Sequence, residues 1–416
     1  MKYTLAEIAD INKFSISKSD NLQEIIYLDT SSITENLISG TCIIPLPEAP
    51  SRAQRKVKSN TIVYSTVRPR LKHYGILNSP PYNLIVSSGF VTIDLKKEYE
   101  DRIDARYLFL LLTQPAITEY IACIADSAVS AYPSFNPSDI SEIAFSFPNI
   151  EKQKAISETW SNFEQKISIN RQINDNLEAM AKQLYDYWFV QFDFPDEDGK
   201  PYKSSGGAMV WNEKLKREIP QGWDFCFLED LLTIRNGRDH KHLADGIYPV
   251  YGSGGEMRKV SEYLYDGESV LMPRKGSLNN IMYVNEAFWT VDTMFYSEMK
   301  LSNCAKYIYY TIKDIDFTRW DSGTGVPSMT SSTLYSIKLV KPQNKTLKKF
   351  DEMISPLFEH MKQISEQNVV LTKQRDELLP LLMNGQATVN YHLSVFYAKH
   401  NQPYLCLRNS ILCPIH

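Results

Sequence analysis

Residues 150–188 read IEKQKAISETWSNFEQKISINRQINDNLEAMAKQLYDYW. Side chains that suit a helix interface recur at alternating spacings of four and three residues: Ile156, Trp160, Phe163, Ile167, Asn170, Asn174, Leu177, Ala181, Leu184 and Trp188. This 4-3 spacing is typical of a coiled-coil seam, because the broader stripe of an ordinary surface helix has a period of 3.6. The stretch therefore predicts one long helix with a partner helix along its seam.

A second stretch repeats this pattern 194 residues further along the chain. Its seam positions are Phe350, Ile354, Leu357, Met361, Ile364, Asn368, Leu371, Arg375, Leu378 and Leu382. Each stretch is preceded by a proline, Pro148 or Pro342. Pro356 and Pro380 lie inside the second stretch, so we expect its helix to start late or to bend. At 1.5 Å per residue, helices of roughly 35–40 residues extend about 55 Å.

The segments before the two helices also resemble each other. Four pairs share the offset of 194: Pro133 with Pro327, Ser134 with Ser328, Ile143 with Ile337 and Pro148 with Pro342. Residues 4–11 resemble residues 227–234, and 87–90 resemble 292–295. Strand-like segments (61–67, 84–93 and 269–272), a helix over 106–124 interrupted near Pro115, and a polar linker over 193–220 complete the pattern. The sequence predicts an α+β chain in which two mixed α/β globules in tandem are each followed by a long helix.

The two helices are expected to pair as an antiparallel coiled coil. With equal numbers of seam layers, Asn170 then lies opposite Asn368, and such a pair fixes register at some cost in stability. The alternative is that the helices are offset and these amides are solvated. The predicted boundaries are 1–148 and 193–342 for the globules, the second including the linker, 149–192 and 343–386 for the helices, and 387–416 for a tail of unassigned role.

Charge is distributed unevenly along the chain. The net charge of −4 disfavours a simple nucleic-acid binder, but residues 49–93 contain no Asp or Glu. Seven basic residues fall there, four on an expected loop and three after a strand: Arg52, Arg55, Lys56, Lys58, Arg68, Arg70 and Lys72. Tyr64 and Asn83 add polar groups. The window predicts contact with DNA phosphates and base edges, and the alternative is a solvated basic surface without a ligand.

The second globule offers a similar but more mixed set of candidates. They are Arg235, Arg238 and Lys241 on one loop, and Arg274, Lys275 and Asn279 around a turn. Gly276 permits a positive φ or a close backbone approach in that turn, which suits a segment lying against phosphate. An ordinary strand-connecting turn is the alternative. Tyr251–Gly255 lacks the features of a phosphate-binding loop and is predicted to be a flexible loop.

Other classes of site find little support. The six cysteines are scattered without C-x-x-C pairs, so neither a metal site nor a disulfide framework is predicted, and a reducing cytoplasm is expected. No run of 18 apolar residues suggests a membrane span. Ser79–Tyr82, SPPY, matches the short signature with which amino-methyltransferases hold a flipped adenine, but no glycine-rich cofactor loop accompanies it. We interpret it as a turn and predict no catalytic residues.

Several motifs resemble those of type I restriction-modification specificity subunits. Residues 219–223 (IPQGW) with 228–231 are similar to the start of a target-recognition domain in that family, and 271–276 (LMPRKG) to its recurrent turn. Residues 371–386 resemble the end of its second helical region. The resemblance covers residues 1 to about 389. The first globule departs from it by lacking the Pro-x-Gly-Trp start, and the tail departs by extending past the usual end.

The resemblance implies a non-enzymatic function in bacterial defence. Each globule would be a target-recognition domain for one half of a split double-stranded DNA target, and the helices would set the gap and dock two methyltransferase subunits. Restriction (motor-nuclease) subunits would join them, and S-adenosylmethionine, ATP and Mg²⁺ would bind to those partners. The alternatives are a coiled-coil adaptor with protein-binding globular ends, and a DNA adenine methyltransferase.

Overall fold

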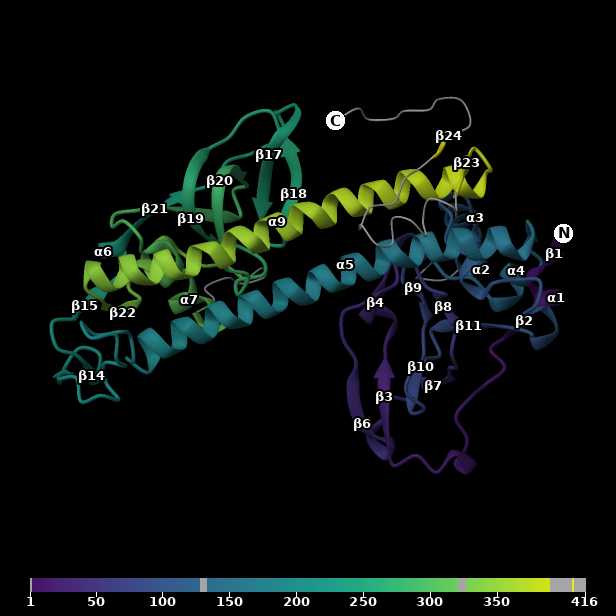
Figure 1. Ribbon diagram of the computed structural model, residues 1–416, viewed down its shortest axis with the longest axis horizontal. Coiled ribbons are helices and arrows are strands. Elements are labelled where there is room, and N and C mark those ends of the chain that lie inside the picture. The colour runs from purple at the N-terminus through teal and green to yellow at the C-terminus, as the bar shows by residue number, and fades with distance from the viewer. Residues whose placement is uncertain (1, 128–132, 321–326, 390–405, 408–416) are drawn as a thin grey trace. The chain divides into compact units, whose positions relative to one another are not determined.

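The computed structural model describes residues 2–127, 133–320, 327–389 and 406–407 (Figure 1). The chain divides into two compact units. Unit 1 comprises Met1–Ile167 with Val370–His416, and unit 2 comprises Ser168–Val369. Each unit therefore contains one globular domain and a segment of each long helix.

The two long helices form where the seam pattern predicts them. Helix α5 spans Ile150–Tyr185 and continues as a π-helical turn, Asp186–Val190, and α9 spans Asn344–Met383. The expectation that the second helix starts late is wrong, because α9 begins directly after Pro342 and includes both internal prolines. Buried neighbours explain this: Ile354 is fully buried beside Pro356, and Leu378 and Leu382 are buried around Pro380. Packing of a helix face outweighs the hydrogen bond that each proline removes.

The polar seam residues confirm the antiparallel pairing. In unit 2, Asn170 donates from Nδ2 to Oδ1 of Asn368 at 2.8 Å and to Oε1 of Gln367 at 2.7 Å. Asn174 donates to Ser365 Oγ at 3.0 Å. In unit 1, Arg375 forms an ion pair with Glu164. Partner numbers on α9 fall as those on α5 rise, so the predicted pairing of Asn170 with Asn368 is confirmed.

The domain of unit 1 contains two four-stranded sheets. One has the order β2-β11-β8-β9 and is antiparallel throughout. The other has the order β6-β3-β10-β7, with β3 and β10 parallel. A short ribbon pairs β1 with β12 directly before α5. The bounds are β1 Lys2–Thr4, β2 Ala9–Ile11, β3 Glu24–Leu28, β4 Ile33–Thr34, β5 Leu37–Ile38, β6 Cys42–Pro45, β7 Ala53–Lys56, β8 Thr61–Ser65, β9 Tyr74–Leu77, β10 Leu84–Ser87, β11 Phe90–Leu95 and β12 Ala144–Ser146.

Four short helices pack beside the first of these sheets and against α5. They are α1 Leu5–Ile8, α2 Ala105–Leu112, α3 Pro115–Asp126 and α4 Pro137–Ser141. The predicted interruption near Pro115 is confirmed, since that residue starts α3. One apolar core joins this sheet and these helices to Trp160 of α5 and Leu378 of α9. The long helices are therefore part of the core of the domain.

The domain of unit 2 has one six-stranded sheet, in the order β16-β21-β19-β20-β17-β18. Only the β17–β20 pair is parallel. A ribbon of β15 and β22 precedes α9, as β1 and β12 precede α5. The bounds are β13 Met209–Asn212, β14 Arg217–Pro220, β15 Asp224–Phe227, α6 Leu228–Leu231, β16 Leu232–Asn236, β17 Asp245–Gly252, β18 Gly255–Val260, β19 Tyr265–Pro273, β20 Met282–Thr290, β21 Met294–Met299, α7 Ala305–Lys313, α8 Ser331–Tyr335 and β22 Lys338–Lys341.

The internal repeat is visible in the topology. The order β2-β11-β8-β9 in unit 1 corresponds to β16-β21-β19-β20 in unit 2, with α1 before β2 and α6 before β16. Residues 4–11 and 227–234, which resemble each other in sequence, thus form the same helix-strand element. The predicted fold class, two α/β domains in tandem with a long helix after each, is confirmed.

The segment 193–220 differs from expectation, and the tail 387–416 is described only in part. The predicted polar linker, 193–220, is folded: Phe194 stacks on Trp223 and Tyr202, with ring centroids 4.8 and 4.7 Å apart, and β13 and β14 form a hairpin. Its aromatic residues provide the apolar contacts that a solvated linker lacks. In the tail, β23 (Ala387–Thr388) pairs with β24 (Cys406–Leu407), and residues 390–405 and 408–416 lie outside the described part of the chain.

Candidate nucleic-acid interface

In unit 1, two turns at the ends of central strands lie against each other. Residues 66–70 follow β8, and residues 87–89 connect β10 to β11. The Thr66 amide donates to the Gly89 carbonyl at 2.9 Å, and the Arg68 amide donates to the Pro133 carbonyl at 2.9 Å. Arg68 has a φ of 49°, a left-handed conformation that is uncommon for a residue with a side chain. We call these two segments the first turn pair.

Unit 2 contains a second turn pair with the same connections. Residues 274–277 follow β19, and residues 291–293 precede β21. The Arg274 amide donates to the Thr293 carbonyl at 2.8 Å, and the Gly276 amide donates to the Pro327 carbonyl at 3.0 Å. Gly276 has a φ of 90°, which is one of the two possibilities that glycine was expected to permit in this turn. Pro133 and Pro327, matched by sequence, thus accept the same bond in both domains.

Some predicted basic residues lie beside the first turn pair. The Ser88 amide donates to the Arg52 carbonyl at 2.7 Å, which places the Arg52 backbone against that turn. Arg52 and Lys58 are exposed, and neither forms an ion pair with any described residue. The Nζ of Lys58 lies 5.5 Å from the ring centroid of Phe14. Arg52 and Arg68 therefore share one edge of the domain.

Other cations of the acid-free window are paired with acids from outside it. Lys56 pairs with Asp20, and Lys72 with Glu35. Arg70 binds Glu119 at 2.7 Å and Asp126 at 2.6 Å, both on α3, and these carboxylates raise the pKa of its guanidinium. A window without acids in the sequence is therefore not an acid-free surface, because folding brings carboxylates to it from elsewhere.

Three details of the prediction for the first domain are corrected. Arg55 and Lys56 lie in strand β7 and not on a loop, because Ala53 of the same strand packs into the core. Tyr64 is 1% exposed, and its hydroxyl donates to Thr118 Oγ1 at 3.3 Å. This burial raises the pKa of the Tyr64 phenol and removes the side chain from any DNA. Asn83 is likewise buried.

In unit 2, the structure brings together candidates from separate loops. The Arg238 amide donates to the Thr290 carbonyl at 2.8 Å, beside the segment that receives the Arg274 amide. Arg238, Lys241 and Lys275 are exposed, and Arg274 is partly exposed. Arg238, Arg274 and Lys275 thus form a basic group around the second turn pair.

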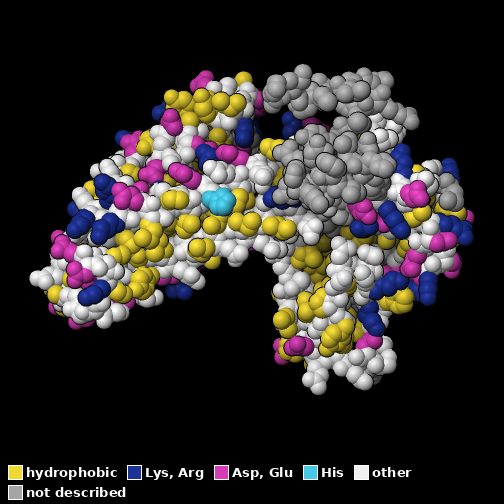
Figure 2. All heavy atoms as spheres, viewed as in Figure 1, with side chains coloured by type: hydrophobic (Ala, Val, Ile, Leu, Met, Phe, Trp, Pro, Cys, Tyr) yellow, Lys and Arg dark blue, Asp and Glu magenta, His cyan; other side chains and the backbone are white. Residues whose placement is uncertain are grey.

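The remaining candidates of unit 2 are engaged within the domain. Arg235 donates to both carboxylate oxygens of Glu298, each at 3.1 Å. Asn279 accepts a bond from the Phe317 amide at 2.8 Å and donates to Asp316. On the face of unit 2 in view, Figure 2 shows Lys and Arg interspersed with Asp and Glu. The basic groups are therefore local features of turns, and no broad basic patch is seen on that face.

Two glycine- or proline-containing motifs can now be placed. Tyr251–Gly255, predicted to be a flexible loop, is instead the tip of the β17–β18 hairpin. Asn280 donates to the Ser253 carbonyl at 2.9 Å, which holds this tip beside the second turn pair. Ser79–Tyr82 is a turn, as predicted, with Tyr82 86% exposed.

The described residues hold neither a metal-binding cluster nor a single helix able to cross a membrane. No group of three or more His, Cys, Asp or Glu side chains there could hold a metal ion. No single described helix is long and apolar enough to cross a membrane, and α2 with α3 passes that test only as a pair bent by 60°.

Sequence reasoning missed the equivalence of the two turn pairs, although one signal for it existed. The matched prolines Pro133 and Pro327 each accept a backbone hydrogen bond from the neighbouring turn, and through them Arg68 corresponds to Gly276. It also missed a buried ionic cluster around Lys306, whose partners lie 38 and 45 residues away. Nothing in the local sequence pattern indicates partners at such separations.

Comparison with known proteins identifies the family. The model of the type I restriction modification DNA specificity domain matches residues 1–179 and 220–368. The MjaIX specificity subunit of Methanocaldococcus jannaschii, a type I restriction enzyme subunit, is 26% identical over 352 residues, which cover 78% of this chain and 77% of the relative. The HindI specificity subunit of Haemophilus influenzae is 22% identical, with 87% of this chain and 94% of the relative covered.

A solved structure agrees with the fold. The crystal structure of a type I restriction-modification S subunit from M. genitalium aligns with a TM-score of 0.54 at 17% identity, covering 92% of this chain and 95% of that one. The two domains of this chain, each followed by a long helix, share the fold of that S subunit. The chain belongs to the family of type I restriction-modification DNA specificity subunits.

Proposed function

We propose that each globular domain reads one half of a split double-stranded DNA target through its turn pair. The observation that carries this proposal is the duplication of the turn pair, with arginine at or beside it in both domains. Guanidinium groups on turns suit guanine and phosphate contacts because their planar fork donates in defined directions, and ammonium groups suit phosphate as compact positive charges. The contacting residues are then Arg52, Lys58 and Arg68 in the first domain and Arg238, Lys241, Arg274 and Lys275 in the second.

The long helices then set the gap between the half-targets and dock two methyltransferase subunits. Exposed apolar side chains on both helices support a docking role, because a solvated helix surface is normally polar. They are Ile169 and Met180 on α5 and Met353, Val369 and Val370 on α9, with exposures between 44% and 67%. Catalysis belongs to the partners in this proposal: the methyltransferase and restriction subunits would bind S-adenosylmethionine, ATP and Mg²⁺, in the cytoplasm.

The first test is to co-express the full chain with the methyltransferase subunit from the neighbouring gene and to map methylated adenines in host DNA. A motif of two defined halves around a fixed gap is the expected result. If the proteins associate but no such motif appears, target reading is refuted. If they do not associate, the adaptor function replaces this proposal. S-adenosylmethionine binding by the isolated chain would instead favour the methyltransferase alternative.

A ruler test follows from the observed pairing of the helices. Removing residues 168–174 of α5 and 364–370 of α9 deletes one seam period from each helix and leaves the remaining layers in phase, because Asn170 pairs with Asn368 and Asn174 with Ser365. Seven residues shorten a helix by about 10 Å, and base pairs stack about 3.4 Å apart. The gap should shrink by about three base pairs. An unchanged gap in a folded variant would exclude the ruler.

A further inference from the structure

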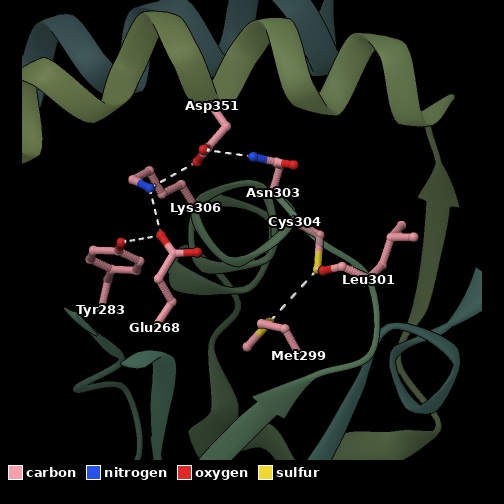
Figure 3. Close-up of polar contacts among 8 residues, drawn as sticks. All are labelled: Glu268, Tyr283, Met299, Leu301, Asn303, Cys304, Lys306 and Asp351. Carbon is pink, nitrogen blue, oxygen red and sulfur yellow. Dashed lines mark hydrogen bonds and ion pairs between the residues drawn. The ribbon is translucent and has the colours of Figure 1, made fainter. Parts of the chain in front are cut away.

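A buried ionic cluster joins the second domain to helix α9 (Figure 3). Lys306 of α7 lies between two carboxylates: its Nζ is 2.7 Å from Glu268 Oε1 on β19 and 2.8 Å from Asp351 Oδ1 on α9. The Lys306 side chain is 4% exposed and that of Asp351 is 14% exposed. Asn303 donates to the second oxygen of Asp351 at 3.1 Å, and Tyr283 donates to Glu268. The bonds therefore fix Asp351 from two directions.

The same domain helix is tied to α5 as well. Lys313, at the end of α7, pairs with Glu178 of α5, which also accepts a bond from Tyr310 at 3.2 Å. The Nζ of Lys306 lies 5.1 Å from the ring centroid of Tyr283 and 5.9 Å from that of Phe358 on α9. Helix α7 is thus held to both long helices by charge and by aromatic rings.

In the first domain, no ion pair among the described residues links the equivalent helix to a long helix, so this domain serves as an internal control. Ala105-Arg106-Tyr107 of α2 corresponds to Ala305-Lys306-Tyr307 of α7, but Arg106 pairs with Asp104, two residues before it. At the offset of 194, Asp351 corresponds to Ser157 of α5, a fully buried residue whose Oγ has no hydrogen-bond partner in the described residues. The fold therefore does not require an acid on the long helix at this place.

We propose that Lys306 and Asp351 are positioning residues, which fix the angle at which the second domain sits on α9 and thereby the length of gap that the protein accepts. This inference rests on the proposed function. Burial of an ion pair gives little net stability, because desolvation offsets the attraction, whereas its directional bonds can specify one arrangement over others. Apolar packing alone tolerates small rotations and shifts that a two-sided carboxylate contact does not.

The test uses the full chain in complex with its methyltransferase subunit. The double variant Lys306→Met/Asp351→Asn removes one positive and one negative charge and nearly keeps the side-chain shapes. Glu268 retains its hydrogen bond from Tyr283. The matched control is Lys362→Met/Glu286→Gln, which removes an ion pair of 3.1 Å between the same helix and the same domain whose side chains are 48% and 32% exposed. Methylation is measured on plasmids that carry the wild-type half-targets with gaps one or two base pairs shorter or longer.

The wild type and the control should each methylate plasmids of one gap length. The double variant should keep both half-target sequences and lose about tenfold in its preference for the correct gap, the size of an ordinary coupling between contacting residues. A folded double variant with the wild-type preference would overturn the inference, since a merely stabilising role changes the melting temperature and not the gap. If the double variant does not fold, Asp351→Asn alone gives the same reading. A wild type without any split motif overturns the proposed function, and this inference with it.

Discussion

Replacement of Gln153 by methionine should destabilise unit 1 specifically. Gln153 lies in the first turn of α5 and is fully buried. Its Nε2 donates to the carbonyls of Arg102 at 2.8 Å and Pro148 at 2.9 Å, and its Oε1 accepts from the Asp104 amide at 3.0 Å. Methionine has nearly the same shape and makes none of these bonds. The substitution therefore isolates their contribution from that of packing.

The expected size follows from the three backbone groups that lose their partner. Each buried group left unpaired costs about 1–3 kcal/mol, and residues 102, 104 and 148 retain some exposure, which favours the low end. The total is about 3 kcal/mol. For a unit of this size, that lowers the melting temperature by about 6–12 °C. Differential scanning calorimetry or circular dichroism of the full chain measures the shift.

Gln114→Met is the matched control, because within the described part of the chain the side-chain amide of Gln114 forms a single hydrogen bond, to the Met383 sulfur at 3.4 Å. Its cost should stay within about 0.5 kcal/mol, as for most substitutions away from buried networks. If Gln153→Met lowers the free energy of unfolding by no more than this control does, the Gln153 amide contributes nothing to stability beyond filling space, and the prediction is refuted. At the offset of 194, the second copy has Leu347, which is fully buried in apolar surroundings. The equivalent buried position at the start of the long helix thus holds a hydrogen-bonding side chain in the first copy and an apolar side chain in the second.

Two further predictions concern charge. Arg238→Ala should weaken DNA binding and reduce the slope of log affinity against log salt by about 0.9, whereas Arg235→Ala, which removes a side chain already paired with Glu298, should leave the slope unchanged. Measuring the affinity of the complex for its target DNA at several salt concentrations distinguishes the two variants. Equal slopes for both variants would contradict the assignment of Arg238 as a DNA contact. Burial raises the pKa of Asp94, so the folded state holds its proton more tightly and stability falls as pH rises above the unfolded carboxyl pKa of 3.8. The melting temperature of Asp94→Asn should therefore exceed that of wild type by more at pH 7 than near pH 3.5, and a difference that does not vary with pH would refute this.

The long-range architecture could be predicted from the sequence because periodicity and repetition reflect packing directly. The 4-3 spacing identified both helices, and the equal offset of the two seams placed Asn170 opposite Asn368, as observed. The expected late start of α9 was wrong for a physical reason. Intrinsic propensity describes an isolated helix, whereas Pro356 lies next to the fully buried Ile354. The folded segment 193–220 was missed because its aromatic residues are spaced too irregularly to give a periodic signal.

The candidate interface could be predicted only in part. Linear charge density led to the region that holds the first turn pair, but it cannot reveal which cations folding will neutralise. Arg70 meets Glu119 and Asp126 from a helix about fifty residues away, while Arg52 meets no acid among the described residues. Tyr64 was misassigned because a tyrosine in a strand alternation can face either side, and its phenol points into the core. Which side a strand residue faces is decided by its sheet partners, which lie elsewhere in the sequence.

The two copies share a central frame and differ outside it. Both keep the central strand order and the turn pair, including a backbone with positive φ at Arg68 and at Gly276. The strands outside this frame differ: unit 1 adds a separate four-stranded sheet, whereas unit 2 extends its central sheet by β17 and β18. Direct readout depends on which side chains reach the base edges, and the backbone frame has only to hold them at the groove. A constant frame with variable additions is therefore what two domains would need if they read different half-targets with one geometry of approach.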